Sequence, residues 1–275
     1  PFPINYRFLT NAPDGSSLTY AEVLGRALGI TLLPNVYSGV PLAMLPEVAL
    51  GGTNYAEGGS RVSEQPGIAN APNSGITTLP LTAQVDKMLA DNPSFNANDL
   101  IILWGGANDV FAQSGAVGAM LIAPETAAAN MAQAAVTLAA QVERVKAAGA
   151  QTVIVVTVPD IGKTPFGLSQ TPQGAGLLTL LSDTFNTQLA ASLAGNAVMV
   201  DSQKLLGAIQ ADPVKYGFTA PNAATVPACS SSSLSCVQSS FPYPNEASAD
   251  SEQRVFADGV HPTTSAHALF GQAAF

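Results

Sequence analysis

Charged residues are scarce in this sequence, and long apolar runs are absent. Only 11% of the 275 residues are charged, against about a quarter in typical globular domains. The longest apolar stretches, such as Thr152 to Val158, are far too short to cross a bilayer. No charged and then apolar leader opens the chain, so we expect any signal peptide to have been removed already. The low charge and the many Ser, Thr, Gly and Pro residues favour a secreted or cell-surface protein.

Histidine, cysteine and positive charge are also in short supply. The net charge is −9, which would repel nucleic acid and anionic lipid. The two histidines, His261 and His267, are too few for a metal site, and Cys229 and Cys236 lack the spacing of zinc ligands. We therefore expect neither a nucleic-acid partner nor a metal. The cysteines are expected to form a disulfide that closes a small loop, with two free thiols as the alternative.

Short apolar runs alternate with helical patterns, which is typical of a parallel sheet wrapped by helices. A single domain of the α/β class over residues 1–275 is expected. Buried strands are predicted at Leu100–Trp104, Thr152–Val158 and Ala197–Val200, with Glu47–Leu50 a weaker candidate. Helices are predicted at Tyr20–Leu28, Leu81–Asp91, Pro124–Ala148, Leu177–Leu193 and Thr263–Phe275. Two long irregular stretches, 32–80 and 212–257, are expected to carry functional loops.

Polar residues follow the strand Leu100–Trp104 directly. Gly106 and Asn108 lie in the segment GGAND at the carboxyl end of this strand, where open α/β sheets bind ligands. An Asn side chain there can donate a hydrogen bond to an oxyanion. An ordinary turn is the alternative. Gly58 and Gly59 could present backbone N–H groups in the same way, or could simply form a loop.

Asp258 and His261 stand three residues apart in ADGVHPT. A carboxylate at this spacing can orient an imidazole, which then acts as a general base towards a nucleophile. A purely structural histidine near a helix start is the alternative. The shortage of other histidines and the presence of a donor in GGAND favour the catalytic interpretation.

Three segments, taken in order, resemble the second, third and fifth conserved blocks of GDSL-type SGNH hydrolases: NYAEGGSRV (54–62), LWGGAND (103–109) and ADGVHPT (257–263). VPDIGKTP (158–165), followed by DTFNTQLAASL (183–193), is similar to the stretch between the third and fifth blocks. The chain looks most like the bacterial esterases and lipases that can be autotransporter passengers. The resemblance implies a three-layer α/β/α sandwich with a small parallel sheet, like that of flavodoxin.

The resemblance implies a serine-dependent carboxylic ester hydrolase that needs no cofactor and acts on a small ester or lipid. His261 would be the general base and Asp258 its orienting carboxylate. Asn108 and Gly59 would donate to the oxyanion, with Gly58 and Gly106 in supporting positions. A catalytically inactive scaffold that binds a lipid or a carbohydrate is the alternative function.

The family's first block, which carries the nucleophilic serine, has no match in the 275 residues. In the family this block also forms a strand of the sheet, so an N-terminal strand is expected to be missing here. We expect the serine to lie in a segment upstream of Pro1, which could also act as a separate peptide. A membrane-anchoring domain outside the chain is a further expectation. Ser16 or Ser17 in PDGSSL is the alternative nucleophile, although no adequate strand precedes it.

Overall fold

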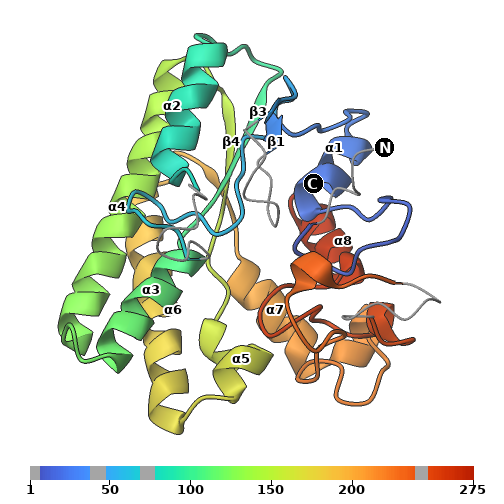
Figure 1. Ribbon diagram of the computed structural model, residues 1–275. Coiled ribbons are helices and arrows are strands. Elements are labelled where there is room, and N and C mark those ends of the chain that lie inside the picture. The colour runs from blue at the N-terminus through green and yellow to red at the C-terminus, as the bar shows by residue number, and fades with distance from the viewer. Residues whose placement is uncertain (1–6, 38–47, 69–77, 239–246) are drawn as a thin grey trace. The chain divides into compact units, whose positions relative to one another are not determined.

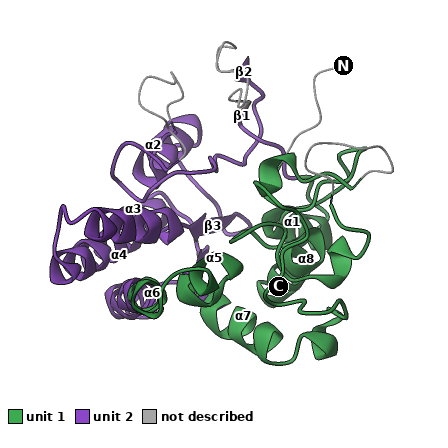
Figure 2. Ribbon diagram, turned by 60° about the horizontal axis from the view of Figure 1, so that its bottom comes forward, with its two compact units in different colours: residues 1–31, 159–179, 202–275 green, residues 32–158, 180–201 purple. Residues whose placement is uncertain are grey.

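The computed structural model of the chain describes residues 7–37, 48–68, 78–238 and 247–275 (Figure 1). Contacts divide the chain into two compact units built from interleaved segments (Figure 2). Unit 1 comprises residues 1–31, 159–179 and 202–275, and unit 2 comprises residues 32–158 and 180–201. The prediction of a single domain over residues 1–275 remains a prediction.

Unit 2 contains a parallel sheet in the order β3 (Leu100–Trp104), β4 (Thr152–Val156) and β5 (Val198–Val200). Ile102 pairs with Ile154, and Ile154 pairs in turn with Val198. β-Branched and other apolar side chains suit strands that are covered on both faces. All three strands were predicted, although β4 ends two residues earlier than expected and β5 begins one residue later.

The helices of unit 2 are α2 (Leu81–Asp91), α3 (Ala107–Gly118) and α4 (Pro124–Ala147), which pack beside one another (Figure 1). α6 (Pro172–Leu193) runs from unit 1 into unit 2. The apolar stripe predicted for α4 is buried, as Met131, Leu138 and Val142 show. The α/β class with a small parallel sheet is thus confirmed.

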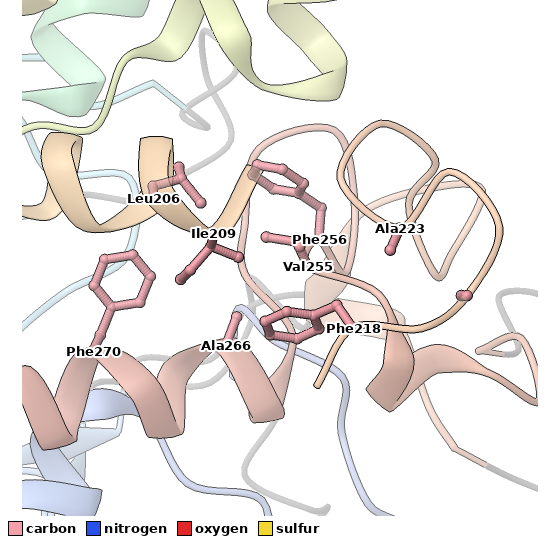
Figure 3. Close-up of a cluster of buried hydrophobic side chains, with 9 residues drawn as sticks. Leu206, Ile209, Phe218, Ala223, Val255, Phe256, Ala266 and Phe270 are labelled. Carbon is pink, nitrogen blue, oxygen red and sulfur yellow. The ribbon is translucent and has the colours of Figure 1, made fainter. Parts of the chain in front are cut away.

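Unit 1 contains α1 (Tyr20–Ala27), α5 (Pro165–Leu168), α7 (Ser202–Ala211) and α8 (Thr264–Ala273). Short 3₁₀ turns lie at Ile161–Lys163, Pro213–Tyr216, Ser233–Ser235 and Ser251–Gln253. Figure 3 shows a cluster of buried apolar side chains from α7, α8, the segment 218–223 and the segment before the Asp258 turn. Its members are Leu206, Ile209, Phe218, Ala220, Ala223, Val255, Phe256, Ala266 and Phe270. This cluster therefore anchors the chain on both sides of residues 257–263.

The structure corrects several predicted elements. Val48–Ala49 (β2) is an exposed strand that pairs antiparallel with Val36–Tyr37 (β1), rather than a buried one, and Glu47 lies outside the described residues. α6 begins at Pro172, five residues before the predicted start, because proline is well tolerated in a first helical turn. GGAND opens α3, which was not predicted, and α7 was also missed.

Candidate active site

The Asp258–His261 segment of unit 1 forms a tight hairpin ahead of α8. The Ala257 N–H donates to the His261 carbonyl at 2.8 Å, and Phe256 pairs with Pro262 across the turn. Thr263 then caps α8, because its side chain accepts a hydrogen bond from the Ala266 N–H. This local framework brings the two predicted residues of the pair together.

The His261 imidazole lies against the Asp258 carboxylate. Its Nδ1 is 2.9 Å from Asp258 Oδ2 and 3.0 Å from Oδ1. Because an ionised carboxylate only accepts hydrogen bonds, we assign the proton to Nδ1, which leaves Nε2 of the neutral ring as the basic nitrogen. The side chain of His261 is 38% exposed, whereas that of Asp258 is only 10% exposed.

Hydrogen bonds keep the Asp258 carboxylate ionised. Burial opposes ionisation of this group, but the hydrogen bond and the electrostatic attraction of the His261 ring, with the His261 and Val260 backbone N–H groups, outweigh it. The pKa of Asp258 therefore lies well below its usual range. A carboxylate that stays charged can orient an imidazole and stabilise its protonated form.

Two further segments of unit 1 contact this hairpin. The Phe8 ring stacks on the His261 imidazole with ring centroids 4.7 Å apart and an interplanar angle of 30°. The Phe166 N–H, at the start of α5, donates to the Gly259 carbonyl at 2.8 Å. Thus the stretch that begins with VPDIGKTP supports the Asp258–His261 turn. Neither phenylalanine was predicted as a site residue, because neither contact is local in sequence.

The expected oxyanion donors lie together in unit 2. Asn108, in the first turn of α3, donates through Nδ2 to the Ser60 carbonyl at 2.7 Å. The next residue, Asp109, accepts from the Val62 N–H at 3.0 Å and lies 3.5 Å from Arg61 Nε. α3 therefore binds the Gly59-containing segment through two consecutive side chains.

Asp109 is an additional residue of this arrangement that sequence reasoning did not single out. Burial raises the pKa of Asp109, while the hydrogen bond from the Val62 N–H and the charge of Arg61 act in the opposite direction. The side chain of Asp109 is 3% exposed. Its place directly after Asn108 in GGAND was the only available signal.

The glycines of the two segments have distinct structural requirements. Gly106 is the N-cap of α3 with φ 109°, and a Cβ built there would lie 2.5 Å from Phe185 Cζ. Gly59 has φ 85°, and its carbonyl accepts from the Ile68 N–H at 2.9 Å. Gly58 is exposed and lies in the same turn. A positive φ and a close neighbour explain why glycine is needed at position 106.

The other histidine, His267, is buried in unit 1. Its Nδ1 accepts from the Tyr20 N–H at 3.2 Å, so the proton of the neutral ring lies on Nε2, 3.3 Å from the Phe8 carbonyl. Burial lowers the pKa of His267 to about 4. The ring is therefore neutral near pH 7 and connects α1, α8 and the N-terminal segment.

The alternative nucleophiles Ser16 and Ser17 lie before α1, in a turn-rich segment of the described chain. The buried Ser17 hydroxyl donates to the Thr10 carbonyl at 2.9 Å and accepts from the Ala12 N–H at 2.8 Å. The Ser16 N–H bonds to Asp14 Oδ1 at 3.0 Å. These contacts are typical of a structural turn rather than of an elbow that presents a nucleophile.

Cys229 and Cys236 form the expected disulfide, with Cα atoms 5.8 Å apart. Within the described parts of the chain, no three His, Cys, Asp or Glu side chains are grouped as metal ligands would be. The helices of these same parts include none that is long and apolar enough to cross a membrane.

Comparison with known proteins links these features to a family. The family model described as "GDSL-like Lipase/Acylhydrolase" matches residues 8–274. An "Uncharacterized protein in trpE-trpG intergenic region" of Pseudomonas putida is 30% identical over 268 residues, which are 92% of this chain and 42% of that protein. "Lipase 1" of Photorhabdus luminescens is 31% identical over 163 residues, which are 58% of this chain and 21% of that protein. The chain spans less than half the length of either relative.

Proposed function

Because the chain belongs to the GDSL-like lipase/acylhydrolase family, we propose that it is part of a serine-dependent carboxylic ester hydrolase. His261 is the general base and Asp258 orients it. The Asn108 side chain and the Gly59 backbone N–H donate to the oxyanion, and Gly58 and Gly106 shape the two donor segments. The nucleophilic serine comes from outside the 275 residues.

The proposed reaction is acyl transfer to water. The serine Oγ attacks the ester carbonyl carbon, and its proton passes to Nε2 of His261. Asn108 and Gly59 stabilise the resulting oxyanion. His261 then protonates the leaving alcohol, which yields an acyl-serine. In the second half, His261 takes a proton from water as the water oxygen attacks the acyl carbon, the bond to the serine Oγ breaks, and His261 returns the proton to Oγ, which releases the free acid and regenerates the serine.

The observation that carries this proposal is the hydrogen-bonded Asp258–His261 pair. A buried, ionised carboxylate within 2.9 Å of Nδ1 holds the tautomer whose Nε2 can accept a proton. A purely structural role for His261 does not require a partly exposed ring with a basic nitrogen. Asn108 adds support, because its carboxamide has a second N–H besides the one bonded to Ser60.

The substrate class follows from the family, whose members include lipases and acylhydrolases. We propose an ester or a lipid ester as substrate. A secreted or cell-surface location is supported by the disulfide and by the low content of charged residues.

The experiment is active-site labelling of the full-length protein with a fluorophosphonate, followed by peptide mapping. We expect one serine adduct outside the 275 residues. His261→Ala should abolish the labelling, whereas His267→Gln, which alters a buried structural ring, should retain it at pH 7.5.

An adduct on Ser16 or Ser17 would refute the proposed origin of the nucleophile. Absence of any adduct, together with no hydrolysis of a panel of aryl and acyl esters, would instead support an inactive scaffold that binds a lipid or a carbohydrate. Equal labelling of the wild-type protein and the His261→Ala variant would refute the role of the base.

A further inference from the structure

The loop between the two cysteines reaches the Asp258 carboxylate. The Ser233 N–H donates to Asp258 Oδ2 at 2.6 Å, across 25 residues of sequence. The other two backbone donors, Val260 and His261, belong to the turn that contains Asp258, and both bind Oδ1. Ser233 is thus a distant backbone donor on the oxygen that also faces His261 Nδ1 at 2.9 Å.

The loop is held firmly at both ends. The Cys229–Cys236 disulfide closes it, and the Cys229 N–H donates to the Ala257 carbonyl at 2.8 Å, next to Asp258. Asn11 binds the loop from the N-terminal segment. Its Nδ2 donates to the Ser233 carbonyl at 3.0 Å, and its N–H donates to the Cys236 carbonyl at 2.8 Å. The position of the Ser233 N–H is therefore determined by contacts outside the Asp258 turn.

We propose that the disulfide-closed loop 229–236 positions the Asp258–His261 pair. The turn amides alone hold one carboxylate oxygen and leave the group able to rotate about that attachment. The Ser233 N–H holds the second oxygen, so the carboxylate plane is fixed and Oδ2 stays directed at Nδ1. Ser233 is a positioning residue that acts through Asp258. This inference rests on the proposed function, because it assigns a role relative to the proposed base.

Ser233 offers a matched pair of variants. It is the first residue of a 3₁₀ turn, and the preceding Ser232 has φ −52° and ψ 132°, which suits a residue before proline. Ser233→Pro thus keeps the turn and removes the N–H donor. Ser233→Ala keeps the N–H and removes a buried hydroxyl that has no hydrogen-bond partner among the described residues.

The experiment measures the tautomer of each histidine from the ring ¹⁵N shifts of the full-length protein at a pH where both rings are neutral. The structure predicts opposite tautomers, with the proton on Nδ1 in His261 and on Nε2 in His267. Ser233→Pro should shift the tautomer ratio of His261 towards Nε2–H by on the order of tenfold, since one hydrogen bond to a charged group is lost. The tautomer ratio of His261 should not change in Ser233→Ala, and that of His267 should not change in either variant.

An unchanged His261 ratio in Ser233→Pro would overturn the proposal, as would equal shifts in both variants. If wild-type His261 does not favour Nδ1–H, the proposed function itself fails. This result differs from a His261 tautomer ratio that favours Nδ1–H but does not respond to Ser233→Pro, which refutes only the role of the loop.

A measurement on the unmodified protein decides the matter if Ser233→Pro does not fold. The Ser233 amide resonance should shift as His261 gains its proton, whereas the Ser235 amide, which bonds to the Ser232 carbonyl at 3.0 Å, should not. A Ser233 amide that ignores this titration would also overturn the proposal.

Discussion

The buried histidine of unit 1 predicts a loss of stability in mild acid. His267 is neutral in the fold, with its pKa lowered from 6.5 to about 4. Between these two values the unfolded chain binds the proton and the folded chain does not, so the free energy of unfolding falls as pH falls. Asp258 does not add to this loss, because its pKa lies well below its usual value and its contribution to stability disappears only in stronger acid.

The magnitude follows from the two pKa values of His267. From pH 7.5 to pH 5.0 the linkage relation gives a loss of about 2 kcal/mol, and the full difference between a pKa of 6.5 and one of about 4 corresponds to about 3 kcal/mol below pH 4. A loss of about 2 kcal/mol lowers a protection factor roughly thirtyfold.

Hydrogen exchange of the α8 amides provides the assay, because α8 carries His267 and packs on α1. Protection factors, corrected for intrinsic exchange, are compared at pH 7.5 and pH 5.0. In His267→Gln, which cannot titrate, we expect most of the pH dependence to vanish. An equal decrease in the wild type and in this variant, or no decrease in the wild type, would refute the reasoning.

Three further predictions concern single side chains. Asn108→Ala should lower the turnover of an ester substrate by about 10²- to 10³-fold, the usual effect of losing one oxyanion donor, and unchanged turnover would exclude that role. Gly106→Ala should lower the urea midpoint and destabilise the protein by more than about 1 kcal/mol, because φ is 109° and Phe185 occupies the space of the new Cβ; an unshifted midpoint would contradict this. Phe8→Ala should lower turnover about fivefold, since a ring pair contributes about 1 kcal/mol, and Phe8→Tyr should retain it; equal losses would argue against stacking on His261.

Several features of this protein could be read from the sequence because their signals are local. The strands Leu100–Trp104 and Thr152–Val156 follow from unbroken apolar runs, and α4 follows from its three- and four-residue apolar spacing. The Asp258–His261 pair was readable because a three-residue spacing within one turn brings the side chains together. The disulfide was predictable from the short distance between the only two cysteines.

Other features depend on contacts between distant segments, which only the tertiary structure decided. GGAND contains turn-forming residues, yet it opens α3 because Gly106 packs on Phe185 and Asp109 binds Val62. The Ser233 N–H reaches Asp258 only because the disulfide and Asn11 place it there. Sequence periodicity reports which face of an element is apolar, but it carries no information on which distant backbone group meets a given side chain. The residue types of the proposed chemistry were therefore visible in the sequence, whereas the groups that hold them in position were determined by the fold.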